Sequence, residues 1–389
     1  MTRELLPFYP PQSNRWITWL IQHFAKPITR ALYKFDIRVS PADIVKLKAL
    51  EENRLVYICN HPSMEDGPAM FCLSAQLGQQ FNYIVTWNLF RGLQGKLLQA
   101  LGCYSIRRGL GDRASITHTL NLLKSPRCRL AIFPEGGCTY QNDKIMPFLP
   151  GAIQMPLKAM DQLTKQLDTK ENHLNLYLVP VSLRYSYVQP LEPMIERSLQ
   201  ALEAELNLQF STHEFYDRLT AIETRILEQL ESEYGFVSDN QLILNQRIAR
   251  LRQHAIAQCK QRLKLDLPDD RSLRERVYKI QAILQAKLPQ TQADKDLYWQ
   301  TVRLLNFDSI YDDYVDKHSS LERFLDTLMR LESETYKAEY LKPKAFRRAK
   351  IKIGNPINLK TYIDAYRTDK TGTLEKLTQQ LQTAVQNNL

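Results

Sequence analysis

The sequence predicts an α/β fold, a mostly parallel sheet flanked by helices, with a large all-helical insertion before the last strand. Three observations support this prediction. Residues 50–190 alternate short apolar runs with amphipathic stretches of helical period, a pattern typical of parallel sheets. Residues 191–347 lack strand-like alternation and carry repeated helical stripes instead. Strand character returns within residues 348–389, which we expect to complete the α/β core.

The first region, residues 1–49, contains an amphipathic segment from 15 to 35. Apolar side chains fall on one side at helical spacing, and basic residues repeat every four on another: Lys26, Arg30 and Lys34. Pro27 predicts a kink or two short helices. This region suits a membrane surface, but a helix packed on its own domain with solvated lysines explains the pattern as well.

Five strands and four helices are predicted in the core region, residues 50–190. The strands are Leu55–Cys59, Tyr83–Thr86, Cys103–Ile106, Leu130–Phe133 and Leu176–Leu183, and the helices lie near 66–77, 89–101, 113–124 and 151–167. If these strands run parallel, the polar stretches that follow them converge on one edge of the sheet, where open α/β sheets bind ligands.

The stretch after the first of these strands contains His61 and Asp66. A turn from strand to helix can bring the carboxylate beneath the ring, where it accepts one ring N–H and leaves the other nitrogen to take a proton. A single match of this kind is common, and Asp66 as a helix N-cap is the alternative. The pair is therefore a candidate general base.

Two later stretches supply charged and flexible residues. Arg107 and Arg108 follow the third strand as candidate phosphate anchors, and Glu135 follows the fourth beside Gly136 and Gly137. Each has an ordinary alternative, because the arginines suit a solvated surface, Glu135 an ion pair and the glycines a tight turn.

Charge and cysteine content limit the class of protein. Residues 1–190 carry 22 Lys and Arg against 13 Asp and Glu, which favours an anionic partner. No nucleic-acid-binding module accompanies this charge, so we expect no nucleic-acid partner. Six cysteines without zinc-site spacing indicate reduced thiols in a cytoplasmic protein. The uncharged run 67–90 contains Pro68 and five amide side chains, which argues against a transmembrane helix, and no signal peptide follows Met1.

Four blocks of the sequence resemble the motifs of the glycerolipid acyltransferase family, which includes the 1-acylglycerol-3-phosphate acyltransferases. In order, they are Asn60-His61-x4-Asp66, Gly102-x3-Ile106-x-Arg108, Phe133-Pro134-Glu135-Gly136 and Val179-Pro180-Val181. The resemblance covers about 50–190 and the C-terminal end. The insertion lies outside it.

The resemblance implies an O-acyltransferase that moves a fatty acyl group from acyl-CoA or acyl-carrier protein to a hydroxyl of lysophosphatidic acid or a related glycerolipid. It implies no covalent intermediate, metal or cofactor. Carried onto this chain, His61 is the general base and Asp66 its orienting partner. The acceptor-binding residues are then Arg108, Arg107, Glu135, Gly136, Gly137 and Thr139. We expect such an enzyme to be peripheral on the cytoplasmic face of a membrane.

The sequence departs from the family pattern at two positions. Cys138 stands where an arginine is usual. The common family sequence Phe-Lys-x-Gly appears here as Phe148-Leu149-Pro150-Gly151, without its lysine. A thiol cannot hold phosphate as a guanidinium does, although Arg107 or Lys144 offers a substitute. These changes indicate an acceptor other than plain lysophosphatidic acid.

The insertion allows several interpretations: a docking surface for a carrier protein, a lid or a structural cap. Its acidic cluster near His318, formed by Asp308, Asp312, Asp313 and Asp316, is interpreted as a solvated face and not a metal site. A different class of protein also remains open. It is a non-catalytic membrane-associated binding protein that uses the insertion to recruit a partner.

Overall fold

The computed structural model describes residues 7–166, 175–209, 214–237, 239, 241–267, 272–287, 290–309 and 319–389, without the side chains of 308 and 309. Two compact units divide the chain. The α/β unit comprises Met1–Arg107, Gly111–Ser186 and Phe346–Leu389, and the helical unit comprises Arg108–Leu110 and Tyr187–Ala345. The predicted fold class is confirmed, because a mostly parallel sheet is flanked by helices and a large helical region separates β6 from β7.

The α/β unit opens with α1 (Arg15–His23), α2 (Ala25–Leu32), β1 (Phe35–Val39), α3 (Pro41–Lys48), β2 (Arg54–Cys59) and α4 (Asp66–Leu77). It continues through β3 (Asn82–Thr86), η1 (Trp87–Leu89), α5 (Gly92–Ala100), β4 (Cys103–Ile106), α6 (Arg113–Lys124), β5 (Arg129–Ile132), α7 (Gly151–Gln166) and β6 (Leu176–Tyr187). After the helical unit come β7 (Arg347–Ile353), β8 (Ile357–Asn358), η2 (Leu359–Tyr362), α14 (Ile363–Thr368) and α15 (Lys370–Gln386). The predicted strands from 55 to 133 differ from β2, β3, β4 and β5 by at most one residue at each end, whereas β6 runs on to Tyr187.

The sheet has the order β1-β7-β6-β2-β5-β3-β4 within the described residues, with β8 paired to β6. β2 lies between β5 and β6 and pairs parallel to both, and β3 pairs parallel to β5 and β4. The carboxyl ends of β2, β4, β5 and β6 therefore meet one edge of the sheet, as the sequence predicts.

β7 is antiparallel to its neighbour β6. Arg347, the first residue of β7, stacks on Tyr185 near the end of β6, while the N–H of Gly354, just after β7, donates to the carbonyl of Pro180 in its middle. β1 pairs parallel to β7 and so shares its direction. As a result, β7 begins at the edge of the sheet where the central strands end.

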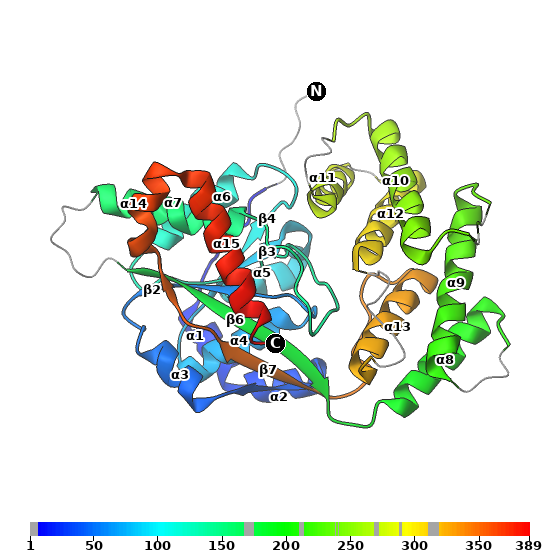
Figure 1. Cartoon of the computed structure of the whole chain (residues 1–389). Helices are drawn as coiled ribbons and strands as arrows, with labels where there is room; N and C mark the ends of the chain where they lie inside the picture. The colour runs from blue at the N-terminus through cyan, green and yellow to red at the C-terminus, as the bar shows by residue number, and fades with distance from the viewer. Residues whose placement is uncertain are drawn as a thin grey trace. The chain divides into compact units, whose positions relative to one another are not determined.

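Helices cover both faces of the sheet (Figure 1). Successive side chains of β2 alternate between the two layers, as a strand buried on both faces requires. Val56 and Ile58 pack in the cluster that contains residues of α6, α7, α14 and α15. Leu55, Tyr57 and Cys59 pack in the cluster that contains residues of α3 and α4. Every residue of β2 is buried, so the chain that leads to His61 is fixed on both sides.

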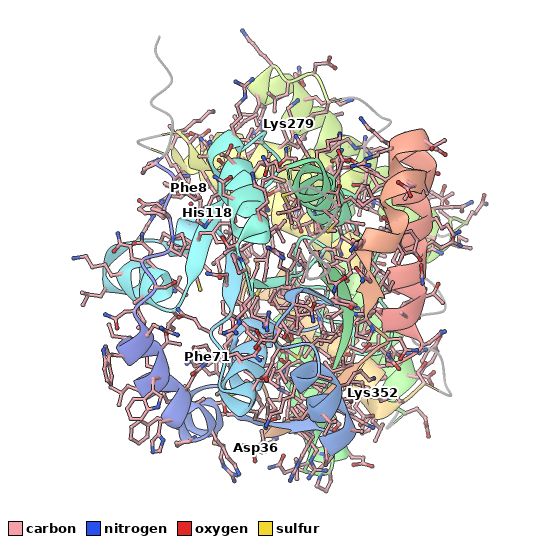
Figure 2. The ribbon with its side chains drawn as sticks, turned by 90° about the vertical axis from the view of Figure 1, so that its left-hand side faces the viewer. Phe8, Asp36, Phe71, His118, Lys279 and Lys352 are labelled. Carbon is pink, nitrogen blue, oxygen red and sulfur yellow. The ribbon has the colours of Figure 1, made fainter. Side chains whose placement is uncertain are left out.

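The N-terminal segment is tied to the edge of the sheet before α1 begins. The N–H of Tyr9 donates to the hydroxyl of Ser105 at 2.9 Å, and Phe8 packs against His118 with ring centroids 5.7 Å apart (Figure 2). The predicted amphipathic segment is broken at Phe24 and ends earlier than residue 35. The reason is that Lys34 adopts φ 52°, after which Phe35 enters β1 and is fully buried.

The helical unit consists, among described residues, of α8 (Glu192–Leu206), α9 (Phe215–Glu233), α10 (Leu244–Leu263), α11 (Leu273–Gln285), α12 (Gln292–Ser309) and α13 (Leu321–Thr335). Its main core joins apolar side chains from all six helices, such as Leu199, Ile222 and Leu251. The side chains of the acidic cluster near His318, formed by Asp308, Asp312, Asp313 and Asp316, lie outside the described part. None of the described helices is both long and apolar enough to cross a bilayer.

Candidate active site

The loop after β2 is clamped to the neighbouring strand β6. The amide group of Asn60 donates to the carbonyl of Leu183 at 2.9 Å and accepts from its N–H at 2.7 Å. Asn60 is itself buried, so both bonds are shielded from water. The next residue, His61, therefore starts from a fixed backbone position.

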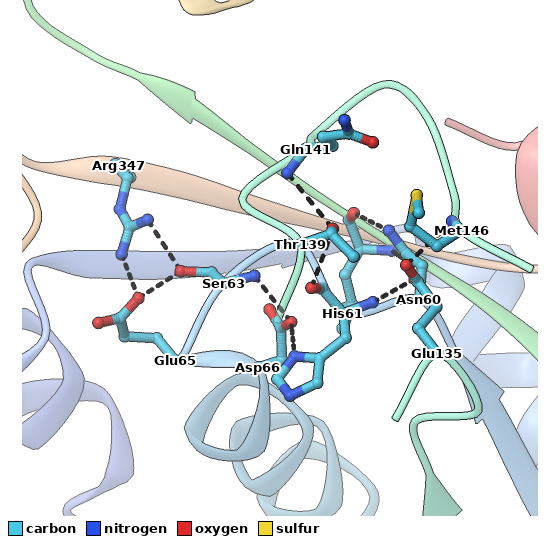
Figure 3. A network of polar contacts seen from close by, with 11 residues as sticks. Asn60, His61, Ser63, Glu65, Asp66, Glu135, Thr139, Gln141, Met146 and Arg347 are labelled. Atoms are coloured by element: carbon cyan, nitrogen blue, oxygen red, sulfur yellow. Dashed lines mark hydrogen bonds and ion pairs between the residues drawn. The ribbon is translucent and has the colours of Figure 1, made fainter. Parts of the chain in front are cut away.

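His61 and Asp66 meet as their spacing predicts. Nδ1 of His61 lies 2.7 Å from Oδ2 of Asp66 (Figure 3), and the side chain of Asp66 is fully buried while that of His61 is 19% exposed. The N–H of Ser63 donates to the same Oδ2 at 3.0 Å. Since that oxygen accepts from a backbone donor, we assign the proton of the ring to Nδ1. Among the described residues, Nε2 of His61 has no hydrogen-bond partner, and the side chain is partly exposed, so Nε2 is the ring nitrogen left to accept a proton.

Asp66 is held at the start of a helix and not at its N-cap. It is the first residue of α4, where the helix dipole favours a negative charge. Burial raises the pKa of Asp66, and the hydrogen bond from His61 is the largest of the opposing effects that lower it. The hydroxyl of Tyr185 also lowers the pKa of Asp66, but its geometry falls outside that of a formed hydrogen bond, so we treat it as an electrostatic contact. The carboxylate is thus destabilised by burial and held by its partners.

Glu135 joins the loop after β5 to the loop after β2. Its Oε1 accepts from the N–H of His61 at 2.8 Å, and its Oε2 accepts from the N–H of Met146 at 3.0 Å. The side chain is buried. Thr139, also buried, donates its N–H to the carbonyl of His61 at 2.9 Å. Both residues therefore fix the backbone of His61, while their predicted contact with the acceptor stays a prediction.

The turn after β5 depends on Gly136. It has φ 78°, a conformation that side chains with a Cβ rarely adopt, and its N–H donates to the carbonyl of Phe133. Gly137 and Cys138 follow in the same loop. Burial, and then the charge of Asp66, raise the pKa of the Cys138 thiol well above its usual value. Cys138 is therefore neutral and supplies no positive charge where the family pattern has an arginine.

Arg107 lies at the end of the edge strand β4, with β3 and β5 between it and β2. Its guanidinium forms a two-pronged ion pair with Asp112, with N–O distances of 3.0 and 3.2 Å. The same interactions lower the pKa of Asp112 against the effect of its burial. Arg107 thus orders the loop between β4 and α6, and its predicted contact with phosphate stays a prediction.

Arg108 belongs to the helical unit by its contacts. Its guanidinium lies 4.6 Å from the ring centroid of Tyr278 in α11, a cation–π distance. The following Gly109 has φ 75°, and a Cβ there would collide with the backbone of Lys279. This segment is therefore packed closely against α11, a feature that no local sequence pattern indicates. The predicted role of Arg108 in binding acceptor phosphate stays a prediction.

Lys144, the other substitute for the missing cation, is exposed in the loop after β5.

Sequence reasoning missed four buried residues beside the His61–Asp66 pair, namely Ser63, Glu65, Tyr185 and Arg347. Ser63 and Glu65 carried a signal, because both fall between the histidine and the aspartate. In the described part of the chain, no group of three or more His, Cys, Asp or Glu side chains could hold a metal ion.

Comparison with known proteins gives one family match. The family model described as Acyltransferase matches residues 39–184, which include His61, Asp66 and Glu135. This part of the chain is therefore an acyltransferase domain. It belongs to the glycerolipid acyltransferase family, as the four sequence blocks indicate. No curated protein matches the chain. The family implies an acyl donor and a hydroxyl acceptor.

Proposed function

We propose that the protein is an O-acyltransferase that moves a fatty acyl group from acyl-CoA or acyl-carrier protein to a hydroxyl of lysophosphatidic acid or a related glycerolipid. The observation that carries the proposal is the 2.7 Å contact between Nδ1 of His61 and Oδ2 of Asp66, inside the matched residues 39–184. A buried carboxylate fixes the ring, and the ring reaches solvent.

The chemistry needs one base. Nε2 of His61 takes the proton of the acceptor hydroxyl as its oxygen attacks the thioester carbonyl, and Asp66 stabilises the imidazolium that forms. The tetrahedral intermediate collapses with cleavage of the C–S bond, and the departing thiolate receives the proton from His61. Ester and free thiol are the products. No covalent acyl-enzyme is required, because the thioester is already activated.

The acceptor is proposed to differ from plain lysophosphatidic acid. Cys138 is neutral where the family pattern has an arginine. Arg107, which could have replaced that charge, is paired with Asp112. An acceptor with a smaller or neutral head group would need fewer cations.

A side-by-side screen tests the activity. Acyl-CoA and acyl-carrier protein are each offered with lysophosphatidic acid, other lysophospholipids and neutral glycerolipids, and release of free thiol is measured. We expect turnover with at least one pair and none without an acceptor. Lipid binding without turnover on any pair would contradict the proposal and support the non-catalytic binding protein instead.

We also propose that α1 and α2 attach the protein peripherally to the cytoplasmic face of a membrane. Their outer surface exposes large apolar side chains, including Trp16 (81%), Trp19 (61%) and Leu32 (72%). Between the helices lies an apolar groove lined by Leu20, Ile21, Phe24, Pro27, Ile28, Ala31 and Leu32. Exposed tryptophan beside aliphatic side chains suits the interfacial region of a bilayer.

The predicted basic stripe contributes less to this proposal than the apolar surface. Arg30 forms an ion pair with Asp36 at 2.8 Å and lies over Phe346, so its charge is partly neutralised within the protein. Lys26 and Lys34 are the other members of that stripe.

Liposome flotation tests the contribution of the apolar surface. The triple variant Trp16→Ser/Trp19→Ser/Leu32→Ser should lose most binding to anionic and neutral vesicles. A matched control, Leu93→Ser/Val237→Ser/Ile243→Ser, removes exposed apolar side chains elsewhere and should bind as the parent does. Equal binding by all three proteins would rule out attachment through α1 and α2.

A further inference from the structure

A cluster of buried charges lies beside the His61–Asp66 pair (Figure 3). Glu65 and Asp66 are consecutive in sequence, and both side chains are almost completely buried. Arg347, also buried, lies beside them. Two neighbouring carboxylates out of water repel one another, and each carries a large desolvation cost. Arg347 supplies the compensating positive charge.

The direction of β7 explains why Arg347 reaches this place. Most residues of the site follow strands whose carboxyl ends meet the edge, but Arg347 begins a strand that runs the other way. Its backbone is fixed there by a bond from its N–H to the carbonyl of Lys34 at 2.8 Å. Its guanidinium stacks on the ring of Tyr185, 4.6 Å from the centroid.

The contacts of Arg347 lead to Asp66 in two steps. Nη2 of Arg347 lies 2.7 Å from Oε2 of Glu65, and Nη1 donates to the hydroxyl of Ser63 at 3.1 Å. The Ser63 hydroxyl in turn donates to Glu65. With its side chain held in this way, Ser63 directs its backbone N–H at Oδ2 of Asp66, the oxygen that also contacts His61.

We infer that Arg347 is a positioning residue for acyl transfer, acting through Ser63 and Glu65 to fix Asp66 and so orient the ring of His61. The inference rests on the proposed function. Arg347 neutralises Glu65, and Asp66 is the carboxylate that contacts the ring. Removing Arg347 adds a net negative charge behind Asp66, and removing Glu65 adds a net positive one.

Other titratable groups surround these carboxylates and are the same residues in every variant of the test. Cys59 on β2, Tyr185 on β6 and Cys138 in the loop after β5 all interact electrostatically with Asp66. Tyr33 interacts electrostatically with Glu65, and Glu135 interacts in the same way with Cys138. Burial raises the pKa of each of these thiols and phenols, so they remain neutral between pH 5 and 8.

The test is a double-mutant cycle of Arg347→Met, Glu65→Gln and the double variant, with kcat, KM and the pH profile of kcat/KM measured for each. Both single variants should lose about 10- to 100-fold in kcat with little change in KM, and the double variant should regain part of the loss. The acid limb should move to higher pH in Arg347→Met and to lower pH in Glu65→Gln, each by about half a unit or more. In the double variant it should return close to that of the parent.

Arg129→Met is the matched control. Arg129 is a buried arginine that also begins a strand, β5, but it bonds to Gln79 and backbone carbonyls at the opposite edge of the sheet. It should lower the unfolding midpoint without moving the acid limb. Overlapping acid limbs in all variants, with losses explained by unfolding alone, would overturn the inference.

A readout independent of turnover keeps this test separate from that of the proposed function. The ring protons of His61 are titrated by NMR in the parent and the three variants. The same order, with Arg347→Met titrating at the highest pH and Glu65→Gln at the lowest, supports the positioning role even if no acceptor is found. Identical titrations would contradict it even in an active enzyme.

Discussion

The two units of this protein both bury charged side chains, but they use them differently. In the α/β unit, Asp66 is fully buried and contacts a histidine whose ring is partly exposed. In the helical unit, Arg303 is buried between Glu233 on α9 and Glu334 on α13, with N–O distances of 3.1 and 2.7 Å. The first arrangement ends on a group that can exchange a proton with a substrate, whereas the second joins helices.

The two arrangements differ in the partner of each buried carboxylate. Burial raises the pKa of Glu334, as it does that of Asp66, but the group that opposes this effect is the buried guanidinium of Arg303 in the same unit. Other ion pairs of the helical unit follow the same plan, such as Arg247 with Glu231 and Arg218 with Glu203. The partner of Asp66 is instead His61, whose ring is partly exposed. Charge changes at the His61–Asp66 pair should therefore lower turnover, and charge changes in the buried ion pairs of the helical unit should lower stability.

The largest expected effect is that of Asp66→Asn. The amide keeps the shape but cannot stabilise the imidazolium, so kcat/KM should fall by about 10³- to 10⁴-fold. Stability at pH 7 should stay the same or rise, since a buried charge is removed. Turnover and chemical unfolding of the same preparation check both parts. A large loss of stability with little loss of turnover would contradict the comparison.

The pH dependence of this stability difference has a defined sign. Because the pKa of Asp66 is raised in the folded state, the native protein holds this proton more tightly than the unfolded chain. The stabilising contribution of Asp66 is therefore present at low pH and is lost as pH rises through the folded pKa. Unfolding free energies measured from about pH 4 to pH 7 should show Asp66→Asn gaining on the parent as pH rises. The opposite trend would show that its partners outweigh burial.

Arg303→Met is the matching change in the helical unit. It leaves Glu334 buried without its cation, which should cost about 3–5 kcal/mol of unfolding free energy. Turnover per folded molecule should change less than about threefold, because surroundings of the reactive ring are unaltered. Urea unfolding combined with active-site-normalised rates measures both. A drop in turnover as large as that of Asp66→Asn would contradict the expected difference between the two units.

The smallest effect is expected at an exposed pair. Arg127 and Glu52 form an ion pair with both side chains about two-thirds exposed, where water screens the attraction. Glu52→Ala should change the unfolding free energy by less than about 1 kcal/mol and leave turnover unchanged. A larger change would mean that the exposure of an ion pair does not predict how much the pair stabilises this protein.

Local patterns predicted the part of the site that forms locally. His61 and Asp66 are joined by one strand-to-helix turn, the condition under which their spacing allows a contact, and the contact is 2.7 Å long. The ends of β2 and β5 met as expected because the two strands are parallel neighbours. Arg107, at the end of the edge strand β4, lies at the same edge of the sheet, with β5 and β3 between β4 and β2.

Features set by topology could not be predicted in the same way. Arg347 reaches Glu65 across 282 residues of sequence because β7 reverses direction, and no motif marks such a reversal. Similarly, the sequence could not tell that both oxygens of Glu135 accept backbone N–H groups, since those donors are fixed only after the loops fold. The position of Glu135 after a strand indicated a site residue. Its burial, and with it the two hydrogen bonds from the backbone, depends on how the loops at this edge of the sheet pack together.

The most direct measurement is the rate of acyl transfer by His61→Ala, compared with His118→Ala. His118 belongs to the same unit and packs between Phe8 and Tyr104, away from Asp66. With the best donor and acceptor, His61→Ala should lose about 10³-fold or more in kcat, partly restored by added imidazole, while His118→Ala keeps its rate per folded molecule. If folded His61→Ala retains turnover within about tenfold of the parent, His61 is not the general base.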